Sequence, residues 1–150
     1  MKYKTEISAG GIVFKKLITK NNELRTEWLI TQHSQNKSWG FPKGLIGDIN
    51  SEEKMEEAAL REVEEEGGVK AMIVRERPIQ VKYKYKFKDT LVNKTVYYFS
   101  MEYISGDPKN HDWEMMDAKF APEKEVKKTL THKSEQEAFE KALKLLKNNL

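Results

Sequence analysis

The sequence predicts an α+β protein in which a mixed β-sheet lies between layers of helices. Strand-like segments stand before and after one helical pattern at residues 51–66, and two further helical patterns end the sequence. A sheet accompanied by such helices buries its two faces beneath helical layers. With 150 residues and 38% hydrophobic content the chain can bury a sizeable core, so residues 1–150 are expected to form a single domain.

The composition excludes several classes of protein. There is no cysteine, which excludes disulfides and thiolate chemistry and is compatible with a reducing cytoplasm. The N-terminus lacks the apolar run of a signal peptide, and no apolar stretch approaches the roughly 20 residues that cross a bilayer. No membrane partner is therefore expected. The formal net charge of +3 is small and does not argue for a nucleic-acid binder, because acidic and basic residues are segregated along the chain.

The first part of the chain predicts two strands joined by a turn. Residues 5–15 have the composition of a strand, and Gly10-Gly11 within it indicates a bulge or a close approach of backbones. Asn21-Asn22 is a turn signal, and residues 28–31 are expected to form the returning strand. A polar loop follows at residues 34–40.

Residues 51–66 show the clearest helical pattern. Asn50 or Ser51 can cap its first turn, and Glu53 stands three residues after Asn50, as a capping box requires. Gly67-Gly68 ends the helix, since glycine tolerates the left-handed conformation found at helix ends. Apolar residues recur every four positions and form one stripe along the helix: Met55, Ala59 and Val63.

The second part of the chain predicts three more strands and two helices. In residues 81–88 aromatic or apolar side chains alternate strictly with lysines, so one face of that strand is aromatic and the other is basic. Gly106-Asp107-Pro108 is a turn. The expected strands are residues 69–76, 79–88 and 94–104 with a short one at 118–121, and the expected helices are 123–130 and 134–147.

Three glutamates of the acidic helix share one face. Glu62 lies one turn before both Glu65 and Glu66, so the three carboxylates converge beside the apolar stripe and repel one another. Partial burial makes this repulsion worse, and a cation would relieve it. An all-oxygen ligand set favours Mg²⁺ or Mn²⁺ over zinc. The alternative is a solvated acidic helix face without a ligand.

Residues 47–69 resemble the Nudix box. Every fixed position of that pattern is filled, and the fixed residues are Gly47, Glu53, Arg61, Glu62, Val63, Glu65, Glu66, Gly68 and Val69. Residues 8–14 and 39–44 are also similar to Nudix proteins. The resemblance implies an α/β/α sandwich with a central mixed sheet. It also implies a hydrolase that uses Mg²⁺ or Mn²⁺ to cut nucleoside diphosphates linked to another moiety.

The resemblance also implies roles for residues of the box. Glu62, Glu65 and Glu66 match the metal-binding glutamates, and Arg61 matches the arginine that orients a glutamate through an ion pair. Glu53 matches a glutamate whose role is structural or supports the metal ligands indirectly. The chain departs from most relatives in one respect: the loop at residues 45–50 is three residues longer, because Gly47 rather than Gly44 opens the box.

Segments outside the box resemble the bacterial and archaeal diadenosine tetraphosphate (Ap4A) hydrolase branch of the Nudix family. They are residues 41–44, 97–103, 112–120 and 137–143. The enzymes of that branch cut asymmetrically and release ATP and AMP. Glu114 stands where the branch carries a carboxylate outside the box, which implies a fourth metal ligand or a general base. The alternative is a surface glutamate.

Three further residues are candidates for substrate binding. Lys43 resembles a phosphate contact, with an ordinary loop lysine as the alternative. Tyr83 and Tyr85 share one strand face on which a base can stack, although aromatics at strand spacing often belong to a core. The lysines that alternate with them face the other way and are expected to be exposed: Lys82, Lys84 and Lys86. His33, His111 and His132 lack the spacing of metal ligands and are interpreted as non-catalytic.

The box leaves several functions open. The substrate can instead be a damaged nucleoside triphosphate, ADP-ribose, an RNA 5′ end or a diphosphoinositol phosphate, because the loops outside the box set specificity. An RNA 5′ end is the only nucleic-acid partner considered. A nucleotide-sensing module without catalysis is the alternative from another class, and the complete set of box carboxylates argues against it.

Overall fold

The computed structural model describes residues 1–47 and 51–147. It contains eight strands, three α-helices and one short 3-10 helix within those residues. In chain order they are β1 (Lys2–Ile18), β2 (Leu24–His33), β3 (Trp39–Gly40), β4 (Lys43–Leu45), α1 (Met55–Gly67), β5 (Val69–Ile73), β6 (Ile79–Phe87), β7 (Thr90–Gly106), η1 (Pro108–Asn110), β8 (Met115–Pro122), α2 (Glu123–Thr129) and α3 (Lys133–Lys147).

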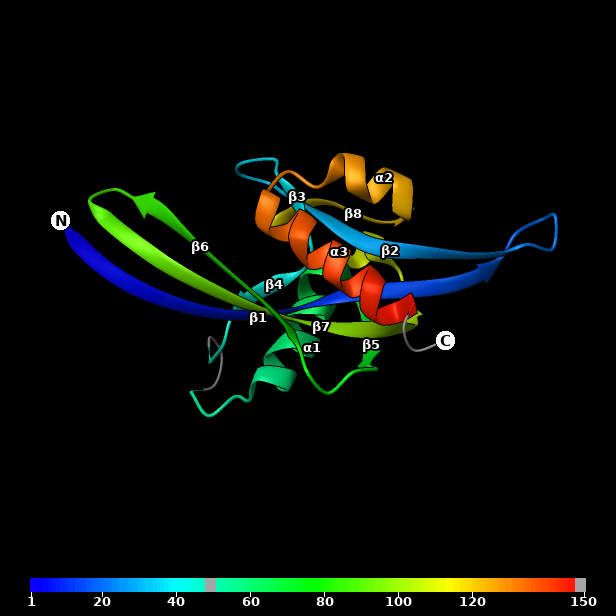
Figure 1. The fold of residues 1–150 in the computed structure, drawn as a ribbon, viewed down its shortest axis with the longest axis horizontal. Coiled ribbons are helices and arrows are strands. Elements are labelled where there is room, and N and C mark those ends of the chain that lie inside the picture. Colours follow the sequence, from blue (N-terminus) through cyan, green and yellow to red (C-terminus); the bar gives the residue numbers. More distant parts are fainter. Residues whose placement is uncertain (48–50, 148–150) are drawn as a thin grey trace.

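The strands form one mixed sheet. Its central path is β3-β2-β1-β7-β5, and β4, β6 and β8 pair with β1, β7 and β2 respectively. The long strands β1 and β7 run parallel, and the other pairs are antiparallel. Beyond the helices, β1, β6 and β7 continue together as an extended three-stranded arm (Figure 1).

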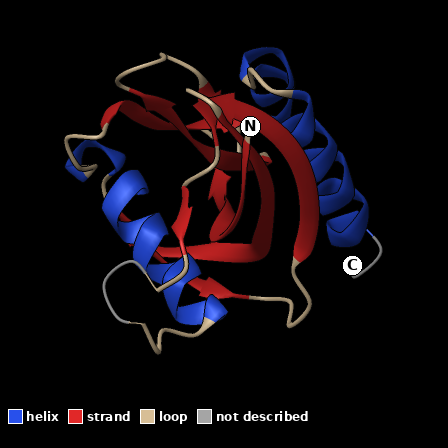
Figure 2. Ribbon diagram, turned by 90° about the vertical axis from the view of Figure 1, so that its left-hand side faces the viewer, coloured by secondary structure: helices blue, strands red, loops and turns tan. Residues whose placement is uncertain are grey.

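Helices cover both faces of the sheet. On one face α1 packs through Ala59 and Val63 onto Val13 and Phe99. On the other face the side chains of α2 and α3, among them Phe139, pack onto the second half of the core. Figure 2 shows the curved sheet between α1 and the helix that runs to the C-terminus. The predicted α+β fold with a mixed sheet between helical layers is therefore confirmed.

The two glycines of β1 mark close approaches, as the sequence indicates. A Cβ on Gly10 would overlap the carbonyl oxygen of Pro42, and one on Gly11 would lie 2.7 Å from Cγ2 of Val63 in α1. The Gly11 N–H donates to the Pro42 carbonyl at 3.1 Å. These contacts bring α1 and the segment before β4 onto the same stretch of β1, which places both beside one cavity.

The acidic helix begins four residues later than predicted. Its first residue is Met55 and its N-cap is Lys54, so the prediction of Ser51 as the cap is wrong, and Asn50 lies outside the described residues. The Lys54 N–H donates to Glu57 at 3.4 Å, and Glu53 accepts hydrogen bonds from Gly47 and Arg61 instead. The end of the helix is as predicted, because Gly68 has a left-handed backbone with φ 72°.

Several strand boundaries differ from the predicted ones, because the pairing of strands in the tertiary structure sets them. Both β5 and β6 pair with the same edge of β7, so residues 74–78 cross between the two pairings and β5 ends at Ile73, not at residue 76. β1 and β7 are longer than predicted because each supports the other along the arm. None of the helices in the described part of the chain has the length and apolar composition needed to span a bilayer.

Candidate active site

One cavity of about 800 Å³ lies between α1, β1, β4, β6 and the start of α3. It brings together residues that are far apart in the sequence. Seven of the eight candidate site residues line it: Lys43, Glu62, Glu65, Glu66, Tyr83, Tyr85 and Glu114. Arg61 stands behind the wall of the cavity and contacts two of these glutamates.

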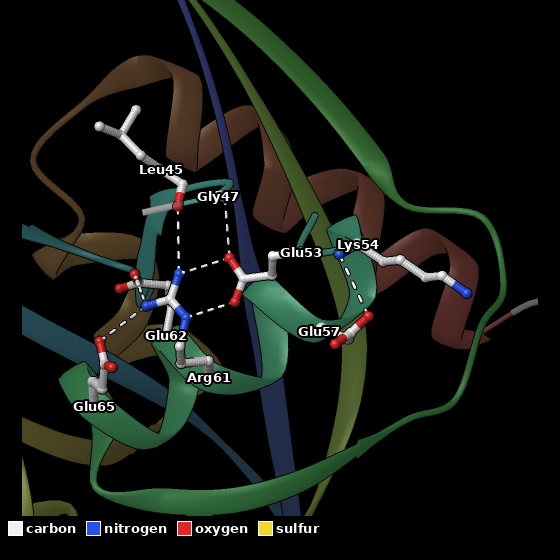
Figure 3. Close-up of polar contacts among 8 residues, drawn as sticks. All are labelled: Leu45, Gly47, Glu53, Lys54, Glu57, Arg61, Glu62 and Glu65. Atoms are coloured by element: carbon white, nitrogen blue, oxygen red, sulfur yellow. Dashed lines mark hydrogen bonds and ion pairs between the residues drawn. The ribbon is translucent and has the colours of Figure 1, made fainter. Parts of the chain in front are cut away.

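Arg61 joins the acidic helix to the loop before it. Its Nε and Nη2 donate to the two carboxylate oxygens of Glu53 at 2.7 and 3.0 Å. Glu53 in turn accepts the N–H of Gly47 at 3.0 Å. On its other side Nη1 donates to Glu62 at 2.6 Å and to Glu65 at 3.1 Å, as Figure 3 shows. The guanidinium therefore fixes the Glu62 carboxylate, and Glu53 fixes the guanidinium.

Two carboxylates of α1 are buried at the floor of the cavity. The residues Glu62 and Glu66 are only 5% and 9% exposed, whereas the side chain of Glu65 is 39% exposed. A Cβ on Gly44 would overlap the Glu62 carboxylate, so glycine leaves the room that this side chain occupies. Glu66 accepts the backbone N–H of Lys43 at 3.1 Å. β4 thus fixes the positions of both buried carboxylates.

Burial raises the pKa of Glu66 to about 8. The backbone N–H and the ammonium of Lys43 oppose this effect, and the negative charges of Glu62 and Asp112 add to it. A divalent cation would offset the cost of ionising Glu66 in this place. The donor set is all carboxylate, which suits hard Mg²⁺ or Mn²⁺.

The carboxylates that line the cavity fit such an ion by their chemistry, and Glu62 and Glu66 also by their burial, but they do not stand as a chelating group. Among residues 1–47 and 51–147, no three His, Cys, Asp or Glu side chains lie close enough together to hold a metal ion. The ion pairs of Glu62 and Glu65 with Arg61 explain part of this arrangement. The assignment of Glu62, Glu65, Glu66 and Glu114 as metal ligands stays a prediction.

One wall of the cavity is basic and aromatic. The rings of Tyr83 and Tyr85 lie 6.3 Å apart, and the Tyr85 hydroxyl donates to Glu6 at 2.7 Å. Lys94, which sequence reasoning did not single out, also lines this wall and pairs with Glu6 at 3.4 Å. Burial lowers the pKa of Lys94 against the opposing effect of Glu6. Base stacking on either tyrosine stays a prediction.

Two other residues of the cavity were missed from the sequence. Glu135, the third residue of α3, is only 4% exposed and pairs with the Lys43 ammonium at 3.7 Å. The Ser8 hydroxyl is buried and has no hydrogen-bond partner among the described residues. Neither has a local signal, because Glu135 lies in an ordinary amphipathic helix and Ser8 in an ordinary strand. The histidines at positions 33 and 132 also line the cavity.

The raised pKa of Glu66 predicts a pH-dependent stability. Between pH 4.5 and about 8 the folded protein keeps a proton on Glu66 that the unfolded chain has released. The free energy of unfolding that Glu66 contributes therefore falls as the pH rises through this range. Urea denaturation in EDTA should show wild type losing stability relative to Glu66→Gln from pH 5 to 8. A difference that is constant with pH would contradict the assignment.

Comparisons with known proteins agree with this architecture. The family model described as NUDIX domain matches residues 17–142. A Mycobacterium tuberculosis protein named MutT4 is 27% identical over 143 residues, which are 94% of this chain and 56% of that protein. The chain therefore spans about half the length of this curated relative.

Solved structures share the fold at low sequence identity. The Caenorhabditis elegans Ap4A hydrolase is 18% identical with a TM-score of 0.65, over 95% of this chain and 98% of that one. The NUDIX domain of Shewanella oneidensis NrtR, complexed with ADP ribose, is 19% identical with a TM-score of 0.70, over 95% and 88%. The MutT protein of Methanosarcina mazei is 18% identical with a TM-score of 0.65, over 98% and 99%.

Proposed function

This chain belongs to the Nudix family of hydrolases, and we propose that it cuts a diphosphate bond in a nucleoside polyphosphate. The proposed substrate is diadenosine tetraphosphate, which one water molecule splits into ATP and AMP. The observation that carries the proposal is the cavity itself. It is lined by the buried carboxylates of Glu62 and Glu66, by Lys43, whose N–H donates to Glu66, and by the tyrosines of β6.

Each wall suits one part of such a substrate. The Lys43 ammonium would contact the phosphate chain, and the orphan hydroxyl of Ser8 would gain a polar partner there. Tyr83 would stack on an adenine, an interaction worth roughly 1–3 kcal/mol per base. A substrate with an adenosine at each end of four phosphates would contact both walls of a cavity of this size.

The carboxylates would carry the chemical step. Glu62, Glu65, Glu66 and Glu114 would hold a divalent cation, and Arg61 would keep Glu62 in place. When bound, Mg²⁺ polarises a phosphoryl oxygen and neutralises charge on the phosphates. Glu62 or Glu114 would accept the proton of the water that attacks phosphorus in line. Positioning and electrostatics supply most of the catalysis in such phosphoryl transfers.

A substrate panel tests the proposal. The protein is incubated with MgCl₂ and diadenosine tetraphosphate, normal and oxidised nucleoside triphosphates, ADP-ribose or a 5′-triphosphorylated RNA, and the products are identified by mass spectrometry. Diadenosine tetraphosphate should give ATP and AMP in equal amounts, and EDTA should stop the reaction. ADP as sole product would contradict the asymmetric cut. ADP-ribose is the second candidate, because the similar NrtR domain is complexed with it.

A further inference from the structure

The segment that carries Lys43 is held along its length by Thr131, which lies just before α3, and by the first turn of α3. The Trp39 N–H donates to the Thr131 hydroxyl at 2.9 Å, and the Thr131 N–H donates back to the Trp39 carbonyl at 3.1 Å. Two residues further on, the Phe41 N–H donates to Glu135 at 2.9 Å. Lys43 follows after another two residues, and its ammonium lies 3.7 Å from the same Glu135 oxygen.

The surrounding residues leave space for the Glu135 carboxylate and fix its position. A single oxygen, Oε2, accepts the Phe41 N–H and the Tyr98 hydroxyl, the latter at 3.2 Å, and faces Lys43. A Cβ on Gly40 would overlap this carboxylate, so the chain leaves space for it. Glu135 is thus fixed by β7 and by the segment before β4, and it is buried although it lies in the first turn of a helix.

We propose that Glu135 is a positioning residue whose buried carboxylate holds the Lys43 ammonium toward the cavity, where the phosphate chain of the substrate would lie. This inference rests on the proposed function, because it presumes an anionic substrate in this cavity. A lysine side chain loses much rotamer freedom when it is held, and a site that holds it in advance spares that loss on binding. At 3.7 Å the ammonium is beyond close hydrogen-bond distance, so its donors can turn to a phosphate oxygen.

The alternative is a purely structural carboxylate that satisfies Phe41 and Tyr98. Glutamine separates the two roles, because its amide oxygen can still accept both hydrogen bonds but carries no charge for Lys43. The Glu135→Gln variant therefore keeps the backbone contacts and removes the ion pair. Glu137 is an exposed glutamate of the same helix, so Glu137→Gln is the matched control for loss of one charge.

The test is a double-mutant cycle on KM and kcat for diadenosine tetraphosphate with Mg²⁺. Glu135→Gln should raise KM about tenfold, the scale of one charge-assisted contact, and leave kcat within about twofold. Glu137→Gln should behave as wild type. In a Lys43→Met background the Glu135→Gln change should have no further effect. An unchanged KM in Glu135→Gln would overturn the proposal. The same increase in KM in the Lys43→Met background would also overturn it.

A second measurement separates this inference from the proposed function. Calorimetric titration of the same variants with ADP measures the coupling between Glu135 and Lys43 without substrate turnover. If wild type turns over no substrate but ADP binding shows the coupling, the proposed function fails and the role of Glu135 stands. Turnover without coupling supports the proposed function and excludes the role of Glu135. If the protein shows no turnover and does not bind ADP, both proposals fail.

NMR of wild type covers the case in which Glu135→Gln does not fold. In the protein without nucleotide, NMR relaxation should show that the Lys43 side chain is less mobile than the side chains of the exposed lysines. Equal mobility would overturn the proposal.

Discussion

Replacing Glu66 with glutamine is expected to lower kcat by about two to three orders of magnitude, the scale of removing one preorganised electrostatic group. Glu66 is one of the two buried carboxylates of α1, and the Lys43 N–H fixes it at 3.1 Å. Glutamine keeps the shape and one acceptor but has no charge for a divalent cation. Steady-state kinetics with Mg²⁺ at pH 8.5, where Glu66 is mostly ionised, measures the effect.

The fold of this variant should be intact. Because burial penalises the charge of Glu66, a neutral side chain of the same shape costs no stability. Glu64→Gln is the matched control, since Glu64 is an exposed glutamate on the same helix. Turnover near the wild-type level in Glu66→Gln would remove Glu66 from the mechanism and with it the proposed metal site.

Replacing Arg61 with methionine is expected to destabilise the protein by about 3–5 kcal/mol, the cost of removing one partner from a buried ion pair. The side chains of Glu53 and Glu62 are 8% and 7% exposed, and both lose their guanidinium contacts in this variant. Among the described residues, only the Gly47 N–H then still donates to Glu53. Urea denaturation at pH 7 in EDTA measures the loss of free energy of unfolding.

An exposed ion pair supplies the control for this prediction. Lys127 pairs with Glu123 one helical turn away, and both side chains are more than 40% exposed. Solvent screens exposed pairs of this kind, so Lys127→Met should change the stability little. A loss below about 1 kcal/mol for Arg61→Met as well would mean that Arg61 does not hold the helix to its preceding loop.

The order of the elements was predictable because helical and strand periods are local properties. Gly68 ends α1 where the sequence places the end, and the spacing of Glu62 and Glu66 sets both on the buried side of the helix. The start of α1 was not predictable in the same way. Glu53 does not cap the helix, because it bonds to Arg61 and to Gly47 across the loop.

The candidate active site was likewise predictable only where local sequence spacing determines it. Local spacing alone grouped the three glutamates of α1, and the pattern of β6 alone set its tyrosines on one face. Glu135 had no such signal, because it meets Phe41 across 94 residues of chain and only after α3 has packed on the sheet.

By itself, the sequence determined the family, the sheet between helical layers and the face of α1 that carries the carboxylates. The tertiary structure alone decided which side chains share the cavity with these carboxylates, because the pairing of β1 with β4 and β7 brings Lys43, Lys94 and Ser8 to it. Periodicity is a property of neighbouring residues, whereas the burial and pairing of a charge depend on every segment packed around it.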